Sequence, residues 1–145
     1  MPILKLSLQN ASGFSQIPPR RFFVRWAKHT LRVDTEVTIR IVDETEGRAL
    51  NHTYRGRDYA TNVLTFPLTE EPDLLGDIVL CAPVIAKEAA EQNKDLMAHF
   101  AHLTVHGVLH LHGYDHENEP QAELMEAIEI QILQKLGYAN PYLVR

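Results

Sequence analysis

The hydrophobic and polar positions along the chain follow first the period of a strand and then that of a helix. Residues 3–8 and 36–42 alternate apolar and polar side chains, and the second stretch, EVTIRIV, is rich in β-branched residues. Both stretches therefore predict strands. Residues 63–66, which end at Pro67, and the apolar run 75–82 predict two more.

Apolar residues at helical spacing predict helices between and after these strands. The predicted helices cover residues 20–33, 44–54, 83–93, 96–111 and 119–136. Asp43 is the predicted N-cap of the second helix, with Glu46 at its third position as in a capping box. The helix over 96–111 is apolar on most sides, which is typical of a central, buried helix. The last helix is predicted to have one apolar face, made of Leu124, Ala127, Ile128, Ile132 and Leu136.

These elements predict an α+β fold, in which a small mixed β-sheet of about four strands packs with about five helices. The 145 residues fit a single domain, residues 1–145. We find no signal peptide and no apolar run long enough for a bilayer, so we expect a cytoplasmic protein without a membrane partner. The one cysteine, Cys81, excludes an internal disulfide and is predicted to be buried.

Three histidines at the end of the central helix have the spacing H-x3-H-x5-H. His106 and His110 lie one helical turn apart, and Gly113 is placed to end the helix so that His116 can return to the same side. Three imidazole ligands with a fourth position open are typical of a catalytic zinc site. We therefore predict one zinc ion at His106, His110 and His116, although such nitrogen sites also bind other divalent transition metals such as nickel and copper.

The same spacing occurs in the metzincin proteases, whose motif has a general-base glutamate directly after the first histidine. This chain has Gly107 at that position. A bound zinc would still acidify a water molecule, but the proton shuttle of the peptidase is absent. The motif therefore favours a metal site and disfavours a protease.

For two other residues of this region, the sequence allows two roles each. His102 lies one further turn back on the same helix face and is either a hydrogen-bonded neighbour of the site or an alternative ligand. His99 and His112 are predicted not to be ligands. Asp115 either orients a ligand imidazole or shapes the turn before His116.

The charge is unevenly distributed, with a net charge of −5 overall. Residues 1–72 hold ten Lys or Arg and eight Asp or Glu, whereas residues 73–145 hold four and eleven. The first half could therefore hold a polyanion. Arg55 and Arg57 flank a glycine in a polar loop, where they are either solvated or placed to contact a phosphate. The helix over 20–33 carries a similar basic stripe, made of Arg21, Arg25, Lys28 and Arg32.

Three blocks of the chain resemble the YbeY family of bacterial rRNA maturation factors. They are YRGRDYATNVLTFP at 54–67, LLGDIV at 74–79 and HGVLHLHGYDH at 106–116. The likeness extends over nearly the whole chain and includes the C-terminal LGYANPY. One mild departure is Thr65, where the family often has Ser.

This resemblance implies a zinc-dependent, single-strand-specific endoribonuclease of the cytoplasm that acts in 16S rRNA 3′-end maturation and in ribosome quality control. It implies His106, His110 and His116 as metal ligands, and Arg55 rather than Arg57 as the functional arginine. The implied partners are single-stranded RNA, the 16S rRNA precursor and the small ribosomal subunit, and we expect no DNA partner. Two other interpretations stay open: a non-catalytic ribosome-assembly factor with a structural zinc, and a zinc hydrolase of a substrate other than RNA.

Overall fold

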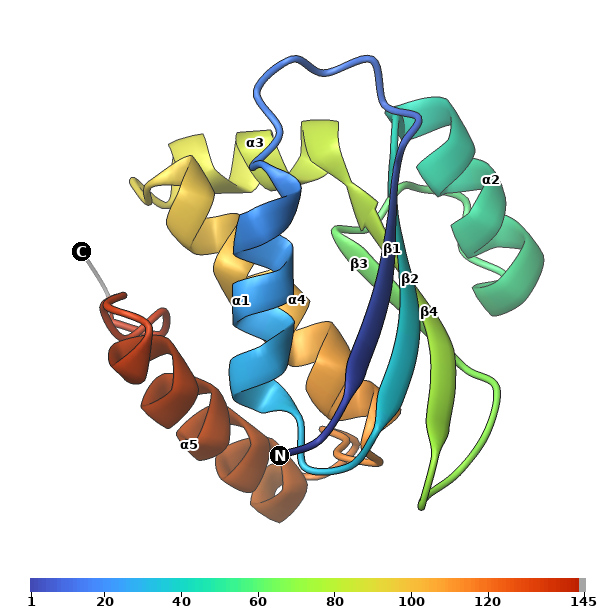
Figure 1. Ribbon diagram of the computed structural model, residues 1–145. Helices are drawn as coiled ribbons and strands as arrows, with labels where there is room; N and C mark the ends of the chain where they lie inside the picture. The colour runs from blue at the N-terminus through green and yellow to red at the C-terminus, as the bar shows by residue number, and fades with distance from the viewer. Residues whose placement is uncertain (144–145) are drawn as a thin grey trace.

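The computed structural model describes residues 1–143, with elements in the predicted order (Figure 1). The strands are β1 (Leu4–Asn10), β2 (Thr35–Val42), β3 (Val63–Pro67) and β4 (Leu74–Cys81). The helices are α1 (Arg20–Thr30), α2 (Glu44–Arg55), α3 (Ala82–Glu91), α4 (Leu96–Leu111) and α5 (Glu119–Lys135). Over the described residues, the predicted α+β fold with four strands and five helices is confirmed, and each boundary lies within three residues of the predicted one.

The four strands form one mixed sheet in the order β1-β2-β4-β3. β1, β2 and β4 are parallel, whereas β3 is antiparallel to β4. Helices α1 and α4 lie on one side of the sheet and α2 on the other, and α5 packs on the outside of α4 (Figure 1). The predicted metal helix, α4, is therefore held between the sheet and α5.

Helix α4 is buried along most of its length, as its sequence predicts. Phe100, Val105 and Val108 are among its core residues. It lies close to the sheet at Gly107, where an added Cβ atom would lie 3.0 Å from Cδ1 and Cγ2 of Ile78 in β4. Within residues 1–143, no helix is both long enough and apolar enough to cross a bilayer.

The predicted apolar face of α5 is partly wrong. Leu124 is 56% exposed, and Ala127 is exposed as well. The other three predicted residues, Ile128, Ile132 and Leu136, do pack on the core. The most buried positions of the helix are Met125, Glu129 and Leu133, at i, i+4 and i+8. Two apolar stripes overlap on this helix, and the buried one contains a carboxylate.

The N-terminus of α2 confirms half of the predicted capping box. The Asp43 side chain accepts a 2.8 Å hydrogen bond from the backbone N–H of Glu46, which is the N-cap interaction. The Glu46 carboxylate does not return to Asp43, because it forms an ion pair with Arg40 at 2.6 Å. The start of α2 is therefore tied to β2 through a side chain as well as through the cap.

Candidate metal centre

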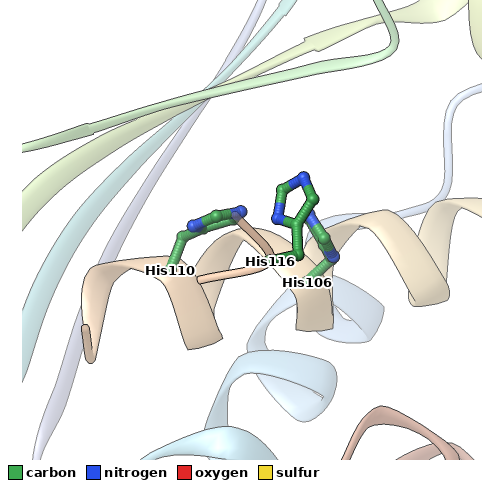
Figure 2. Close-up of side chains that lie close together, drawn as sticks. All are labelled: His106, His110 and His116. Atoms are coloured by element: carbon green, nitrogen blue, oxygen red, sulfur yellow. The ribbon is translucent and has the colours of Figure 1, made fainter. Parts of the chain in front are cut away.

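The three motif histidines converge at the C-terminal end of α4 (Figure 2). Ring centroids of His106 and His110 lie 4.7 Å apart, since one helical turn separates the two residues. The helix ends at Leu111, and Gly113 has a φ of +94°, a conformation that glycine adopts without strain. The chain then turns back, and the centroid of the His116 ring lies 5.4 Å from that of the His106 ring and 5.1 Å from that of the His110 ring.

The donor atoms of these rings are placed to share one ion. One nitrogen from each of His106, His110 and His116 lies within 4.8 Å of the others. Within residues 1–143 this is the one group of three or more His, Cys, Asp or Glu side chains that could hold a metal ion. Three imidazole nitrogens fit zinc, and they leave a fourth position without a protein ligand.

The surroundings of His110 keep its ring neutral and able to bind a metal. Burial, followed by the neighbouring imidazoles of His106 and His116, lowers the pKa of His110 from 6.5 to about 4. The charge of Arg55 acts in the same direction. A neutral imidazole has a free lone pair, so the His110 ring needs no deprotonation at neutral pH before it can act as a ligand.

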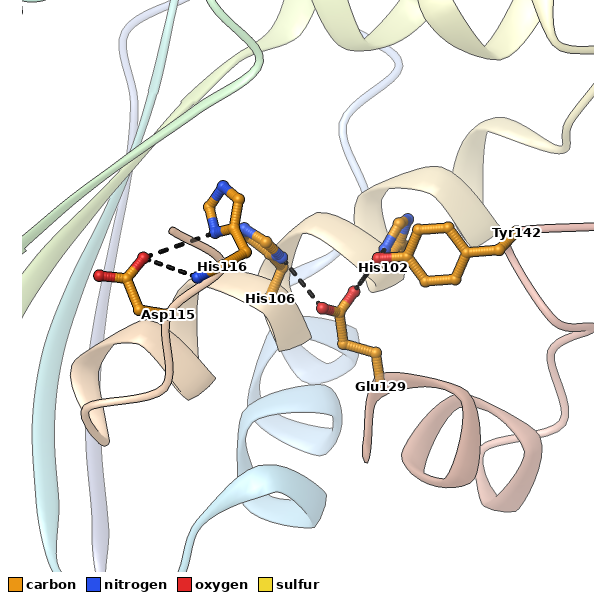
Figure 3. Close-up of polar contacts among 6 residues, drawn as sticks. All are labelled: His102, His106, Asp115, His116, Glu129 and Tyr142. Carbon is orange, nitrogen blue, oxygen red and sulfur yellow. Dashed lines mark hydrogen bonds and ion pairs between the residues drawn. The ribbon is translucent and has the colours of Figure 1, made fainter. Parts of the chain in front are cut away.

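The carboxylate of Glu129 in α5, which we did not predict as part of the site, contacts His106 of the cluster. Oε2 of Glu129 lies 3.1 Å from Nδ1 of His106, and Oε1 lies 2.7 Å from Nε2 of His102 (Figure 3). The Tyr142 hydroxyl donates a third hydrogen bond, 2.6 Å long, to Oε1. A carboxylate on the far nitrogen of a metal-binding histidine fixes the ring orientation and the tautomer.

Hydrogen bonds keep this buried carboxylate ionised. Burial alone would raise the pKa of Glu129, but bonds from His102 and His106 lower it to about 2. Burial and the bond to Glu129 raise the pKa of Tyr142, so its hydroxyl keeps its proton and donates it. Burial is also the largest effect on His102, and it lowers the pKa of that ring.

The structure separates the remaining histidines of this region from the cluster. His102 is the hydrogen-bonded neighbour that one of our two alternatives described. His99 pairs with Glu88 at 2.9 Å. Nδ1 of His112 contacts the carbonyl of Val108, while its Nε2 accepts the backbone N–H of Arg32. None of these three rings belongs to the metal-binding group.

Asp115 mainly shapes the turn before His116. Its Oδ1 accepts a 2.7 Å hydrogen bond from the backbone N–H of His116, but it lies 3.7 Å from Nδ1 of the same residue (Figure 3). The second distance is that of an ion pair and is too long for a hydrogen bond. The carboxylate that orients a histidine of the cluster is therefore Glu129, which comes from another helix.

An open cleft of about 620 Å³ lies over the three histidines. Both loop arginines, Arg55 and Arg57, line it, and so do the polar side chains Thr61, Asn62 and Thr65. Nη1 of Arg57 donates to the Tyr59 hydroxyl at 3.2 Å. Within residues 1–143, the Arg55 guanidinium makes no hydrogen bond.

The basic stripe predicted over residues 20–33 lies elsewhere, and its last member, Arg32, follows the end of α1. Its four side chains are exposed, and none of them lines the cleft. Arg55 was predicted in the loop but is the last residue of α2, directly before Gly56 with a φ of +68°, and Arg57 follows in the loop. The end of this helix therefore places both arginines. The cleft thus combines three imidazoles with two guanidinium groups, which suits an anionic substrate.

Packing against the sheet explains the glycine at position 107, and this explanation bears on the protease interpretation. A side chain at this position would point at Ile78 in the sheet, so a glutamate there would meet the core. Positions 106 and 110 face the cleft instead. The helix therefore presents its histidines to the cleft without the glutamate of a metzincin.

Comparisons with known proteins show the family to which this chain belongs. The family model "Endoribonuclease YbeY" matches residues 18–137. The Endoribonuclease YbeY of Methylobacillus flagellatus is 64% identical over 142 residues, which cover 98% of this chain and 95% of the relative. The Nitrosomonas europaea protein of the same name is 52% identical, with 98% and 87% covered. The solution structure of TM1509 from Thermotoga maritima superposes with a TM-score of 0.58 at 25% identity, covering 94% of this chain and 99% of that one. The chain belongs to the YbeY endoribonuclease family.

Proposed function

We propose that this protein is a zinc-dependent endoribonuclease that cuts single-stranded RNA. We further propose that it acts in the cytoplasm on the 3′ end of the 16S rRNA precursor and in quality control of the ribosome, with the small subunit as a partner. The observation that carries the proposal is the convergence of three histidine nitrogens in a cleft that also contains Arg55. Membership of a family named for endoribonuclease activity supports it.

The proposed roles follow from the chemistry of each side chain. His106, His110 and His116 would hold the ion, which supplies a Lewis acid for the phosphate and acidifies water. Arg55 would neutralise negative charge that develops on the phosphoryl oxygens, through charge-assisted hydrogen bonds. Its guanidinium suits this role because it is exposed in the cleft and makes no hydrogen bond within residues 1–143.

The concave shape of the site supports a preference for single strands. Single-stranded RNA can bend its backbone into a cleft and turn its bases outward, whereas a duplex presents a rigid surface. The hydroxyls of Thr61 and Thr65 in the cleft wall add hydrogen-bonding groups for phosphate or sugar. Cleavage breaks one phosphorus–oxygen bond of the backbone, with either the RNA 2′-OH or water as the nucleophile. A 2′,3′-cyclic phosphate end would identify attack by the 2′-OH.

The test is cleavage of a single-stranded RNA that carries the 16S 3′ end, compared with the same sequence in a duplex. We expect the purified protein to hold about one zinc per chain, to cut the single strand, to stop when a chelator removes the ion and to recover when zinc is returned. Unfolding on metal removal, with binding of small subunits but no cleavage, would support the assembly factor instead. Cleavage of a peptide or amide without any need for Arg55 would support the other hydrolase.

A further inference from the structure

Glu129 is a buried charge whose position packing alone does not explain. Its side chain is fully buried between Met125 and Leu133 on the inner face of α5. Removing a carboxylate from water costs several kcal/mol by an order-of-magnitude estimate, and an apolar residue of similar size often gives a more stable protein. The reason for a carboxylate at this position must therefore lie in the groups that it contacts.

The two oxygens of Glu129 have different surroundings. Oε1 accepts hydrogen bonds from Nε2 of His102 at 2.7 Å and from the Tyr142 hydroxyl at 2.6 Å. Oε2 contacts Nδ1 of His106 at 3.1 Å. One oxygen is thus anchored by two donors that are not part of the metal cluster, and the other is directed at a residue of that cluster (Figure 3).

This contact determines which nitrogen of His106 is available. An ionised carboxylate can only accept, so Nδ1 of His106 carries the proton and Nε2 carries the free lone pair. His116 has no comparable bond, because Asp115 lies 3.7 Å from its ring. Within residues 1–143, His106 is the one residue of the three whose ring is hydrogen-bonded to a carboxylate.

The anchor depends on a C-terminal segment that does not line the cleft. Tyr142 follows the end of α5, and its backbone N–H donates to Oδ1 of Asn140 at 2.9 Å, a local bond that shapes the turn. The same segment contains Tyr138, whose hydroxyl accepts a 3.3 Å hydrogen bond from Nε1 of Trp26 and does not contact Glu129. The C-terminal block LGYANPY thus supplies one tyrosine that supports the carboxylate and another that packs on α1.

We propose that Glu129 is a positioning residue of the metal centre: it holds His106 with Nε2 toward the other two imidazoles, and His102 and Tyr142 hold Glu129. This inference rests on the proposed function, since it assumes that the cluster binds zinc. Loss of such an outer hydrogen bond typically weakens metal binding by about 10–100-fold. Zinc affinity is therefore the property that should change, beyond any change in the stability of the metal-free fold.

The experiment compares the wild type with Glu129→Gln, Tyr142→Phe and the matched control Tyr138→Phe. Zinc affinity is measured by competition with a chelator, and the melting temperature is measured on metal-free protein. We expect Glu129→Gln to bind zinc about 10–100-fold more weakly. Tyr142→Phe should show a smaller loss in the same direction, and Tyr138→Phe should bind like the wild type. Long-range ¹H–¹⁵N spectra should show the Nδ1–H tautomer of His106 in the wild type.

Tyr142→Phe keeps the inference testable if Glu129→Gln does not fold, because it removes one donor near the surface. Wild-type zinc affinity in both variants would overturn the inference, and so would an Nε2–H tautomer of His106. An equal loss of affinity in Tyr138→Phe would also overturn it, because the effect would then be one of general packing. These outcomes leave the proposed function intact. If the wild type binds no zinc, the metal site of the proposed function fails, and the role of Glu129 fails with it.

Discussion

Helix α4 carries two groups of histidines that differ in the partners of their rings. Near its start, His99 and His102 are buried and pair with the carboxylates of Glu88 and Glu129. Near its end, His106 and His110 are only partly buried, and together with His116 they face an open cleft. The helix, the residue type and the spacing are similar, but the surroundings are not.

The difference teaches that the partner of an imidazole decides what the ring can do. A ring whose nitrogen donates to a carboxylate in the core contributes to the fold. A ring with a free lone pair that faces other such rings across a cleft can bind a metal ion. His106 belongs to both groups. One of its nitrogens contacts Glu129, and the centroid of its ring lies 4.7 Å from the centroid of the His110 ring.

The largest effect on zinc binding and cleavage is expected for the histidines that face the cleft. His110→Ala removes one of three ligands, so zinc affinity should fall by more than the about 10–100-fold that the loss of an outer partner costs, and RNA cleavage should fall below detection. The metal-free variant should keep the helical circular dichroism of the wild type, because His110 lies at the edge of the cleft. Metal content and cleavage are measured on the same samples, and a metal-free variant that cuts RNA would refute the assignment.

Arg55→Ala tests whether the open side of the cluster is the reacting side. The variant should stay folded and loaded with zinc but cut RNA about 10²–10³-fold more slowly, the usual cost of losing one group that stabilises transition-state charge. Arg57→Ala is the matched control, since Arg57 lines the same cleft and donates to Tyr59. Equal losses in the two variants would indicate a general attraction for RNA and not a specific role of Arg55.

His99→Leu tests the buried group. It should leave zinc content and cleavage unchanged while lowering the free energy of unfolding by about 1–2 kcal/mol, because Glu88 loses one of its hydrogen-bond donors. The Asn62 amide still donates to Glu88 at 3.0 Å, which limits the loss. Urea denaturation measures the change. A variant that lost its zinc would contradict the division of α4 into two groups.

The smallest effect is the pH dependence of metal-free stability. The folded pKa of His110, about 4, lies below its ordinary value of 6.5, so the unfolded chain binds more protons between these values. This contribution is therefore fully present above about pH 6.5 and is lost as the pH falls toward 4. His110→Gln should flatten the slope of unfolding free energy against pH in that window. A slope that is unchanged in the variant would assign the dependence to other groups.

The convergence of the three histidines could be predicted from the sequence because its geometry is local. His106 and His110 depend only on the helical repeat, and Gly113 marks the reversal that returns His116. The same holds for the cap at Asp43, where one turn of helix contains both partners.

Glu129 could not be predicted in the same way, because its contacts join α4, α5 and the C-terminal segment. Helical spacing of the apolar residues favoured a face of α5 that only partly overlaps the buried one, and it left Glu129 outside that face. The available signal was the spacing of Met125, Glu129 and Leu133, which places one carboxylate within an apolar stripe. The order of the strands in the sheet likewise depends on long-range packing, since β3 precedes β4 but lies outside it.

The most direct test of the account is anomalous X-ray diffraction from crystals grown with zinc. The account predicts one strong peak at the end of α4, with nitrogens of His106, His110 and His116 at about 2.0–2.1 Å and a fourth position open to the cleft. A peak beside His99 or His102 would contradict the division between the two histidine groups. A fourth protein ligand that closes the site would contradict the proposal of a catalytic ion.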